Sequence, residues 1–190
     1  DAVCSAFTRL QTADGTNPAG TVATGRTTTF NAGQINFKGE VYYANYGFDL
    51  KDVAAAFAGD VTLGLEATHI SELSTSVTGT TFNRTDDTVE SPDWTGRFNA
   101  GYAYGPLRVS YQLNYLDNVL RVEGATIEND PNPYVDSNIT HDLSAIYAFD
   151  NGVSLRAGVT NLTDEGPSYP TLSYGDILGR RYFAGVNFKF

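Results

Sequence analysis

The sequence predicts an all-β protein built from antiparallel strands. Three observations carry this prediction: apolar and polar residues alternate over seven segments, tight turns alternate with long polar connections, and 13% of the residues are aromatic while only 18% are charged. A period of two is typical of strands, because successive side chains point to opposite faces of the pleat. We expect seven strands, or eight if residues 21–31 also form one.

Each predicted strand has one apolar face and one polar face. The first lies in 40–50, where Tyr42, Tyr46 and Phe48 share a face. The others are 61–68, 94–104, 107–115, 142–149, 153–160 and 181–190. The polar faces carry glycine, serine, asparagine and threonine together with the charged residues Glu66, Arg97, Arg108, Asp142, Arg156, Arg181 and Lys189.

The connections between the strands alternate in length. Gly105-Pro106 and Asp150-Asn151-Gly152 are tight turns, since Asn and Gly tolerate the positive φ that short hairpins need. The long polar connections are about 71–91, 117–136 and 164–178. This alternation is typical of an up-and-down barrel whose two rims differ. In an outer-membrane barrel the short turns face the periplasm.

A membrane barrel and a soluble β-sandwich would both show alternating strands, and we favour the membrane barrel. Tyrosines lie near the strand ends with Leu, Val and Ala between them, as in a lipid-facing band with aromatic girdles. The polar face is richer in glycine, and the loops are longer, than a sandwich would require. Lipid tolerates no unpaired sheet edge, so the strands either close a small barrel or belong to a larger one.

Composition excludes several other classes. The net charge of −10 argues against binding to nucleic acid, which needs a basic surface. The longest apolar stretch, at 53–59, is far shorter than the roughly 20 residues of a spanning helix. Met is absent and residue 1 is Asp, so we expect a processed chain or a fragment. The single cysteine, Cys4, allows no internal disulfide, and it is either a free thiol or paired outside this sequence.

Residues that could carry chemistry are few. His69 and His141 lack the spacing of metal ligands, and no GxSxG nucleophile motif is present. The acidic group Asp86, Asp87, Glu90 and Asp93 lacks the glycine-punctuated spacing of a calcium loop and is expected to be a solvated outer loop. We therefore expect neither an enzyme nor a bound metal or cofactor.

The C-terminal run 161–190 resembles the end of a TonB-dependent outer-membrane receptor. Asn161-Leu162-Thr163-Asp164 is similar to the family's N-L-T/F-D element, and Gly179-Arg180-Arg181-Tyr182 to the G-R-x-Y that opens the last strand. The segments 31–50 and 91–117 resemble earlier strands, although Glu40 sits one place early. The residues that resemble the signal of the barrel-assembly machinery are Gly185, Phe188 and Phe190, with Phe183 where that signal often has a polar residue.

The resemblance implies that residues 31–190 are the C-terminal strands of a 22-stranded barrel with a plugged lumen. It implies that residues 1–30 are an outer-loop and strand segment, in which Cys4 pairs with a cysteine upstream of this sequence. The whole receptor would import a scarce ligand, such as a siderophore, cobalamin, haem or carbohydrate, across the bacterial outer membrane.

The implied partners are the N-terminal barrel and plug of the same receptor (in the same or a separate chain), TonB through that plug, the barrel-assembly machinery, and outer-membrane lipid with lipopolysaccharide. Two alternatives remain open. One is a small complete outer-membrane barrel that acts as a porin, adhesin or lipid-modifying enzyme, and the other is a soluble β-sandwich binding module.

Overall fold

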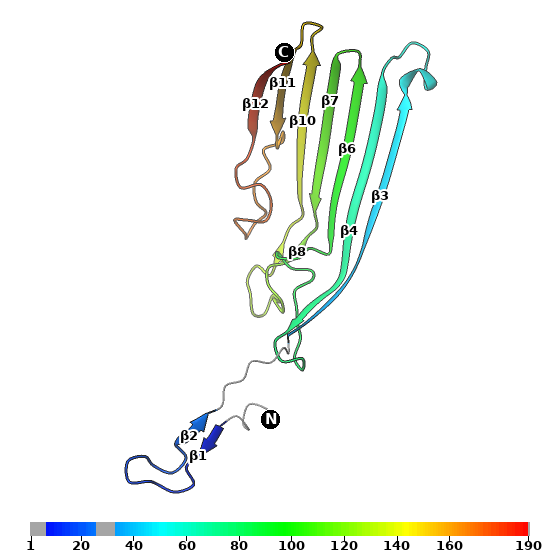
Figure 1. Cartoon of the computed structure of the whole chain (residues 1–190). Helices are drawn as coiled ribbons and strands as arrows, with labels where there is room; N and C mark the ends of the chain where they lie inside the picture. Colours follow the sequence, from blue (N-terminus) through cyan, green and yellow to red (C-terminus); the bar gives the residue numbers. More distant parts are fainter. Residues whose placement is uncertain (1–6, 26–32, 190) are drawn as a thin grey trace. The chain divides into compact units, whose positions relative to one another are not determined.

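The computed structural model describes residues 7–25 and 33–189, and within these ranges the chain is all-β (Figure 1). The chain divides into two compact units, Asp1–Gly33 and Gln34–Phe190. In the first unit, β1 (Phe7–Arg9) pairs with β2 (Val22–Gly25) in a sheet of their own. In the described ranges no helix has the length and apolar character needed to cross a membrane.

The second unit is dominated by one antiparallel up-and-down sheet. Its order is β12-β11-β10-β7-β6-β4-β3, so each long strand pairs with the long strand that precedes or follows it in the chain. The two-residue strand β5 (Asn83–Arg84) adds to β4. The long strands are β3 (Gln34–Asp49), β4 (Asp60–Ser76), β6 (Trp94–Tyr104), β7 (Leu107–Leu116), β10 (Asn138–Ala148), β11 (Val153–Thr160) and β12 (Arg181–Phe188).

The tight turns lie at one end of this sheet and the long loops at the other, at the top and bottom of Figure 1. Gly105 and Gly152 occupy the two predicted turns with φ of 51° and 82°. The third connection at the turn end contains a 3-10 helix, η2 (Leu50–Asp52). At the loop end, β8 (Val119–Leu120) pairs with β9 (Tyr134–Val135).

The two longest strands run further than the alternation predicts. β3 begins at Gln34 and β4 continues to Ser76, so the predicted loop at 71–91 is wrong over residues 71–76. The two strands stay paired on both sides of a β-bulge between Lys38 and Gly39. Ile35 and Phe37 still alternate with polar residues in this part of β3, whereas Leu73 is the one apolar residue in 71–76 of β4.

The possible eighth strand at 21–31 is confirmed over residues 22–25. Residues 22–25 do form β2, but β2 pairs only with β1 among the described strands, and residues 26–31 lie outside the described ranges. Cys4 and Phe190 also lie outside them. In the part of the chain that the structure describes, β3 and β12 each pair on one side only, so the sheet does not close.

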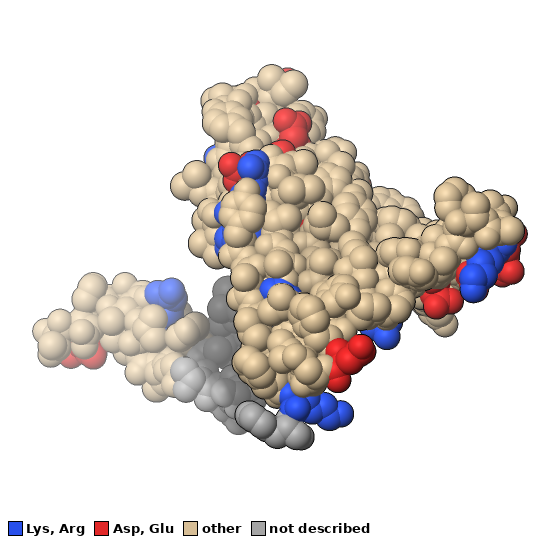
Figure 2. Space-filling model, turned by 90° about the horizontal axis from the view of Figure 1, so that it is seen from above, with Lys and Arg blue, Asp and Glu red and all other residues tan. Residues whose placement is uncertain are grey.

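The pairing register places the predicted apolar residues of all seven strands on one face. Leu65 pairs with Phe98, and Phe98 pairs with Leu113. This face remains open: Tyr46 and Val186 are 67% and 59% exposed. Seen from the turn end, most of the surface is formed by uncharged residues (Figure 2).

The packed core lies at the loop end rather than against the sheet. It consists of Val119, Val135 and Tyr174, with Val89 and Leu116 packed against them. No described element covers the apolar face of the sheet, where large side chains such as Tyr46 and Val186 remain exposed.

Candidate functional site

The polar face of the sheet is hollowed along one row of paired residues. This row crosses all seven strands, and six of its seven members are small: Gly47, Thr62, Gly101, Ser110, Ser144, Gly158 and Phe183. Small side chains leave the backbone uncovered, so a depression forms where larger residues would fill the space.

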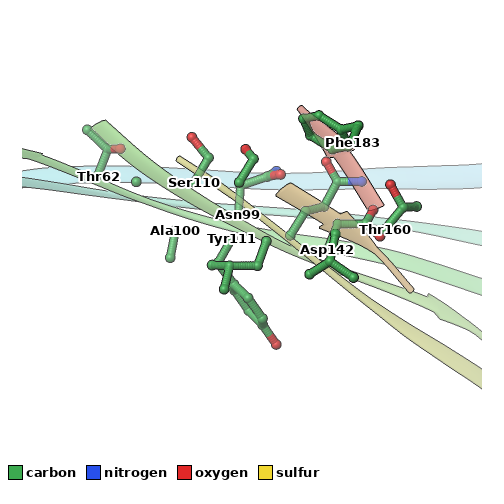
Figure 3. Close-up of a pocket in the computed structure, with 13 residues that line it drawn as sticks. Thr62, Asn99, Ala100, Ser110, Tyr111, Asp142, Thr160 and Phe183 are labelled. Atoms are coloured by element: carbon green, nitrogen blue, oxygen red, sulfur yellow. The ribbon is translucent and has the colours of Figure 1, made fainter. Parts of the chain in front are cut away.

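Two adjoining hollows lie over this face, and together we call them the polar trough. The hollow at the middle of the sheet has a volume of about 330 Å³. The hollow toward the long loops has a volume of about 550 Å³. The two share Asp142 and Thr160, so they are continuous. Figure 3 shows Thr62, Ser110 and Phe183 on the trough side of the strands.

Side chains with hydroxyl, amide and carboxyl groups line the trough together with apolar ones. The middle hollow includes Thr62, Asn99, Ser110, Gln112, Asp142, Ser144, Thr160 and Phe183. The loop-end hollow includes Thr95, Asn114, Asn138, Thr140, Asp142, Thr160, Tyr174, Asp176 and Arg181. Hydroxyl and amide groups both donate and accept hydrogen bonds, and carboxylates accept them, so the trough offers donors as well as acceptors.

One aromatic ring interrupts the small-residue row. The ring of Phe183 lies across Gly158, so close that a Cβ added at Gly158 would be 2.5 Å from Cζ of Phe183. The guanidinium carbon of Arg156 lies 5.2 Å from the ring centroid, which is within cation–π distance. Phe183, the residue that departs from the family's assembly signal, therefore faces the trough.

Asp142 is the carboxylate at the junction of the two hollows. Its Oδ1 accepts a hydrogen bond from the backbone N–H of Asn161 at 2.8 Å. Its Oδ2 accepts only a long one, at 3.5 Å, from the side chain of Asn114. Within the described ranges Asp142 has no ion-pair partner, so it retains lone pairs for a ligand.

Asn161, from the N-L-T-D segment, anchors the loop that follows β11. Its side chain is fully buried: Nδ2 donates to the carbonyl of Glu165 at 2.7 Å and to Oδ2 of Asp176 at 3.2 Å, and Oδ1 accepts from the N–H of Glu165 at 2.9 Å. The residue has φ of 54°, which Asn tolerates better than most residues. These contacts hold the loop against the end of β11.

The G-R-R-Y segment meets the N-L-T-D segment at the other end of the same loop. Arg181 pairs with Asp176 at 2.8 Å, and this hydrogen bond holds the pKa of the Asp176 carboxyl below its usual value. Gly179 has φ of 68°, and a Cβ there would lie 2.9 Å from Oδ1 of Asp164. The structure thus brings together the two segments that carry the family resemblance.

Both histidines lie on the apolar face, away from the trough. His69 accepts or donates a 2.9 Å hydrogen bond to Glu40 and stacks on Trp94 at 4.3 Å. His141 forms a 2.7 Å hydrogen bond with the hydroxyl of Tyr111. The serines of the trough therefore have no histidine beside them. Over residues 7–25 and 33–189, no three His, Cys, Asp or Glu side chains are grouped to hold a metal ion.

No protein-family model, curated protein or solved structure matches this chain. The functional interpretation therefore depends on the geometry of the sheet and on the residues that carry the resemblance.

The acidic loop before β6 is organised by one ion pair. Asp86 is buried against Arg84, and hydrogen bonding to this guanidinium lowers the pKa of the Asp86 carboxyl. Burial raises the pKa of Asp87 and of Asp93. The expectation of a solvated loop is therefore wrong for Asp86. Its carboxylate is buried because it pairs with Arg84 and accepts a hydrogen bond from the N–H of Leu73.

Gly185 and Phe188, two of the three residues expected to form the assembly signal, are absent from the lining of the trough, and the third, Phe190, lies outside the described residues. Phe188 pairs with Val153 at the turn end of β12 and is 62% exposed. Gly185 has open space where a side chain would stand. Sequence reasoning missed the small-residue row, whose signal is present only when the strands are aligned in register.

Proposed function

We propose that this chain forms the C-terminal part of the barrel wall of a TonB-dependent receptor in the bacterial outer membrane, and that it serves import rather than catalysis. The observation that carries the proposal is an antiparallel up-and-down sheet with one open apolar face and with two edge strands, β3 and β12, that pair on one side only among the described strands.

The apolar face supports a lipid environment. Leu65 is 51% exposed on this face, and Tyr182 is 75% exposed. A continuous apolar surface of this kind would be unstable in water. Tyr42 stacks with Trp94 near the loop end, at ring centroids 6.2 Å apart, as residues of an aromatic girdle do.

The free edges of β3 and β12 support a larger barrel. In hydrocarbon every backbone N–H and C=O must be paired, so a sheet in lipid closes. We propose that further strands of a 22-stranded barrel pair with β3 and β12, and that they belong to the same receptor, which also supplies the plug and, through it, the contact with TonB.

The loop that joins β11 to β12 supports the family resemblance. Its two ends carry N-L-T-D and G-R-R-Y, and the side chains of Asn161, Asp164 and Arg181 all make contacts that fix the loop. We propose that Gly185, Phe188 and Phe190 are presented to the assembly machinery during insertion, and that lipopolysaccharide contacts the outer rim.

Fractionation of cells that produce the tagged chain tests the proposal. We expect the chain in the outer-membrane fraction, extracted only by detergent and accompanied by plug-bearing polypeptide. Mass spectrometry of the purified material identifies that partner, or the corresponding part of one longer chain.

Expression of residues 1–190 alone provides the control. We expect no heat-modifiable, protease-resistant monomer, because the edges of β3 and β12 would be unpaired. Such a monomer would favour the small complete barrel, and a monomer that is stable in water without detergent would favour the soluble β-sandwich.

A further inference from the structure

The longest apolar stretch of the sequence, residues 53–59, lies outside the strands of the sheet. It forms most of the connection between β3 and β4, at the turn end (Figure 1). The other two connections at this end are the tight turns at Gly105-Pro106 and Asp150-Asn151-Gly152. A hairpin needs only a few residues to connect its strands, so the apolar connection is longer than its topology requires.

This connection folds onto the apolar side of the sheet at the turn end. Tyr102 lies on the apolar face, where it pairs with Val61, and its hydroxyl donates a 2.9 Å hydrogen bond to the carbonyl of Ala58. Gly59 has φ of 108° and lies so close to this ring that an added Cβ would be 2.7 Å from Cε2 of Tyr102. Residues 58 and 59 are therefore held against the same face that carries the exposed apolar side chains of the strands.

The connection presents an exposed apolar surface of its own. Val53 is 67% exposed and Phe57 is 56% exposed. Local hydrogen bonds hold the backbone that carries them: the N–H of Val53 donates to the carbonyl of Leu50 at 3.1 Å, and the N–H of Phe57 donates to the carbonyl of Ala54 at 2.9 Å. The surface therefore belongs to an ordered segment that begins with η2.

Aromatic side chains mark the same end of the apolar face. The ring centroids of Tyr46 and Phe48, at the end of β3, are 5.6 Å apart. Those of Tyr147 and Phe149, at the end of β10 and just beyond it, are 4.8 Å apart. Tyr102, which holds the connection, belongs to this group. Aromatic rings gathered at strand ends are typical of the boundary between membrane and water, so the apolar connection lies at the level of such a boundary.

Backbone and charge restrict the depth at which the connection could lie in a membrane. A lipid-exposed irregular segment does not lie in the hydrocarbon region, because its backbone groups need water as a partner. Lys51 and Asp52, at the start of the connection, are exposed and carry opposite charges, so attraction to anionic lipid contributes little. The boundary between headgroups and acyl chains satisfies both constraints, since it offers apolar contact and water side by side.

We propose that residues 53–57 form an interfacial contact with phospholipid, in which Val53 and Phe57 insert at the boundary between headgroups and acyl chains of the leaflet at the turn end. This inference rests on the proposed function, because it requires lipid against the apolar face. It adds a lipid-binding element outside the strands, which would fix the turn end of the sheet at a defined depth in the bilayer.

Photo-crosslinking of the complete receptor that contains this chain, reconstituted in phosphatidylcholine vesicles, tests the proposal. The photoreactive residue p-benzoylphenylalanine replaces Phe57, Leu65 or Asp150 in three separate variants. Leu65, 51% exposed on the apolar face, reports lipid contact of the strands. Asp150, exposed in a tight turn at the same end of the sheet, is the matched control for contact of any turn with lipid. Mass spectrometry of peptides from the irradiated protein measures the fraction that carries a lipid adduct.

We expect phospholipid adducts at positions 57 and 65, and at least about fivefold fewer at position 150, because a charged tight turn stays in water. Fragment masses locate the carbon atom of the lipid that is attached. We expect this atom to lie nearer to the glycerol for position 57 than for position 65, since the connection should sit at the interface and the strand deeper in the bilayer.

The three positions separate the two proposals. Adducts at position 65 without adducts at position 57 would overturn the interfacial contact and leave the receptor proposal standing. A crosslink from position 57 to a polypeptide in place of lipid would also overturn the contact, and so would equal lipid adducts at positions 57 and 150. A folded, heat-modifiable receptor without lipid adducts at position 65 would overturn the lipid environment of the apolar face, and the interfacial contact with it.

Discussion

The carboxylate of Asp164 accepts a hydrogen bond from the backbone N–H of Arg180 at 2.8 Å. These residues are separated by the whole loop between β11 and β12, so the bond closes the loop at its base. Gly179 precedes Arg180 with positive φ and leaves the space that Asp164 occupies. The segments 161–164 and 179–182 therefore contact each other at the base of this loop and together hold it closed.

Two substitutions of Asn161 separate the effect of its buried hydrogen bonds from the effect of its positive φ. Asn161→Gly keeps the left-handed backbone but removes the buried hydrogen bonds, and we expect it to lower the free energy of unfolding by about 1–3 kcal/mol. Asn161→Ala also removes the hydrogen bonds and adds a Cβ at φ of 54°, so it should cost about 1–2 kcal/mol more. Unfolding of the protein in denaturant measures both changes in free energy. Equal losses of unfolding free energy in Asn161→Gly and Asn161→Ala would show that the positive φ at this position places no constraint on the residue type.

The facing of β7 in lipid can be tested with two adjacent residues. Leu113 lies on the apolar face between Phe98 and His141, and Gln112 lies on the polar face. Leu113→Arg should lower barrel stability by about 2–4 kcal/mol, because it places a charge in hydrocarbon. Gln112→Arg should be much milder. Folding into bilayers measures the difference, and equal tolerance of the two substitutions would contradict the assignment of the faces.

The close approach of Phe183 to Gly158 predicts a steric requirement for glycine. A Cβ at Gly158 would lie 2.7 Å from the backbone oxygen of Leu143, which cannot move freely. Gly158→Ala should therefore lower the free energy of unfolding by about 1–3 kcal/mol. Gly47, in the same row, has only ordinary contacts of 3.7 and 3.9 Å around its Cβ position. Gly47→Ala is the matched control, and we expect it to leave the unfolding temperature in detergent unchanged.

Two neighbouring aspartates at the loop end should respond to pH with opposite signs. Hydrogen bonding to Arg84 lowers the pKa of Asp86 in the folded state, so its stabilising effect is present above the unfolded pKa and is lost as pH falls through the folded pKa. Burial raises the pKa of Asp87, so its contribution is favourable below the unfolded pKa and is lost as pH rises through the folded pKa.

We therefore expect Asp86→Asn to lower the unfolding temperature at pH 7, and Asp87→Asn to raise it. Asparagine at position 87 tolerates the positive φ of 57° found there. Both effects should shrink at pH 3, where the aspartates are largely protonated in the unfolded chain. Unfolding temperatures of the two variants, measured at both pH values, check the signs. A stabilising Asp86→Asn at pH 7 would contradict the role of the ion pair with Arg84.

The alternation of side chains was sufficient to predict most of the sheet. The boundaries of β6 at Trp94–Tyr104 and of β11 at Val153–Thr160 agree with the expected ranges. The first strand was expected to begin too late, at residue 40, although Ile35 and Phe37 alternate with Gln34, Asn36 and Lys38. Alternation is weak only in residues 71–76 of β4, where Leu73 is the one apolar residue and backbone pairing with β3 extends the strand.

The site was much harder to predict than the fold. Gly47, Thr62 and Gly101 are unremarkable in the sequence, and they form a row only through the register of three strands. Phe183 was expected as a variation of a terminal signal, and its contact with Gly158 depends on the pairing of β11 with β12. Register is set by many weak pairings at once, which no single segment encodes.

The two borders of the sheet differ in length, since β3 has 16 residues and β12 has eight. At about 3.4 Å per residue, the free border of β3 is about 54 Å long and that of β12 about 27 Å. A strand that docked on β3 could form roughly twice as many backbone hydrogen bonds as one that docked on β12. A wrong alignment on β3 would thus misplace more side chains than one on β12, because a shift by one residue turns every side chain of the docked strand to the other face.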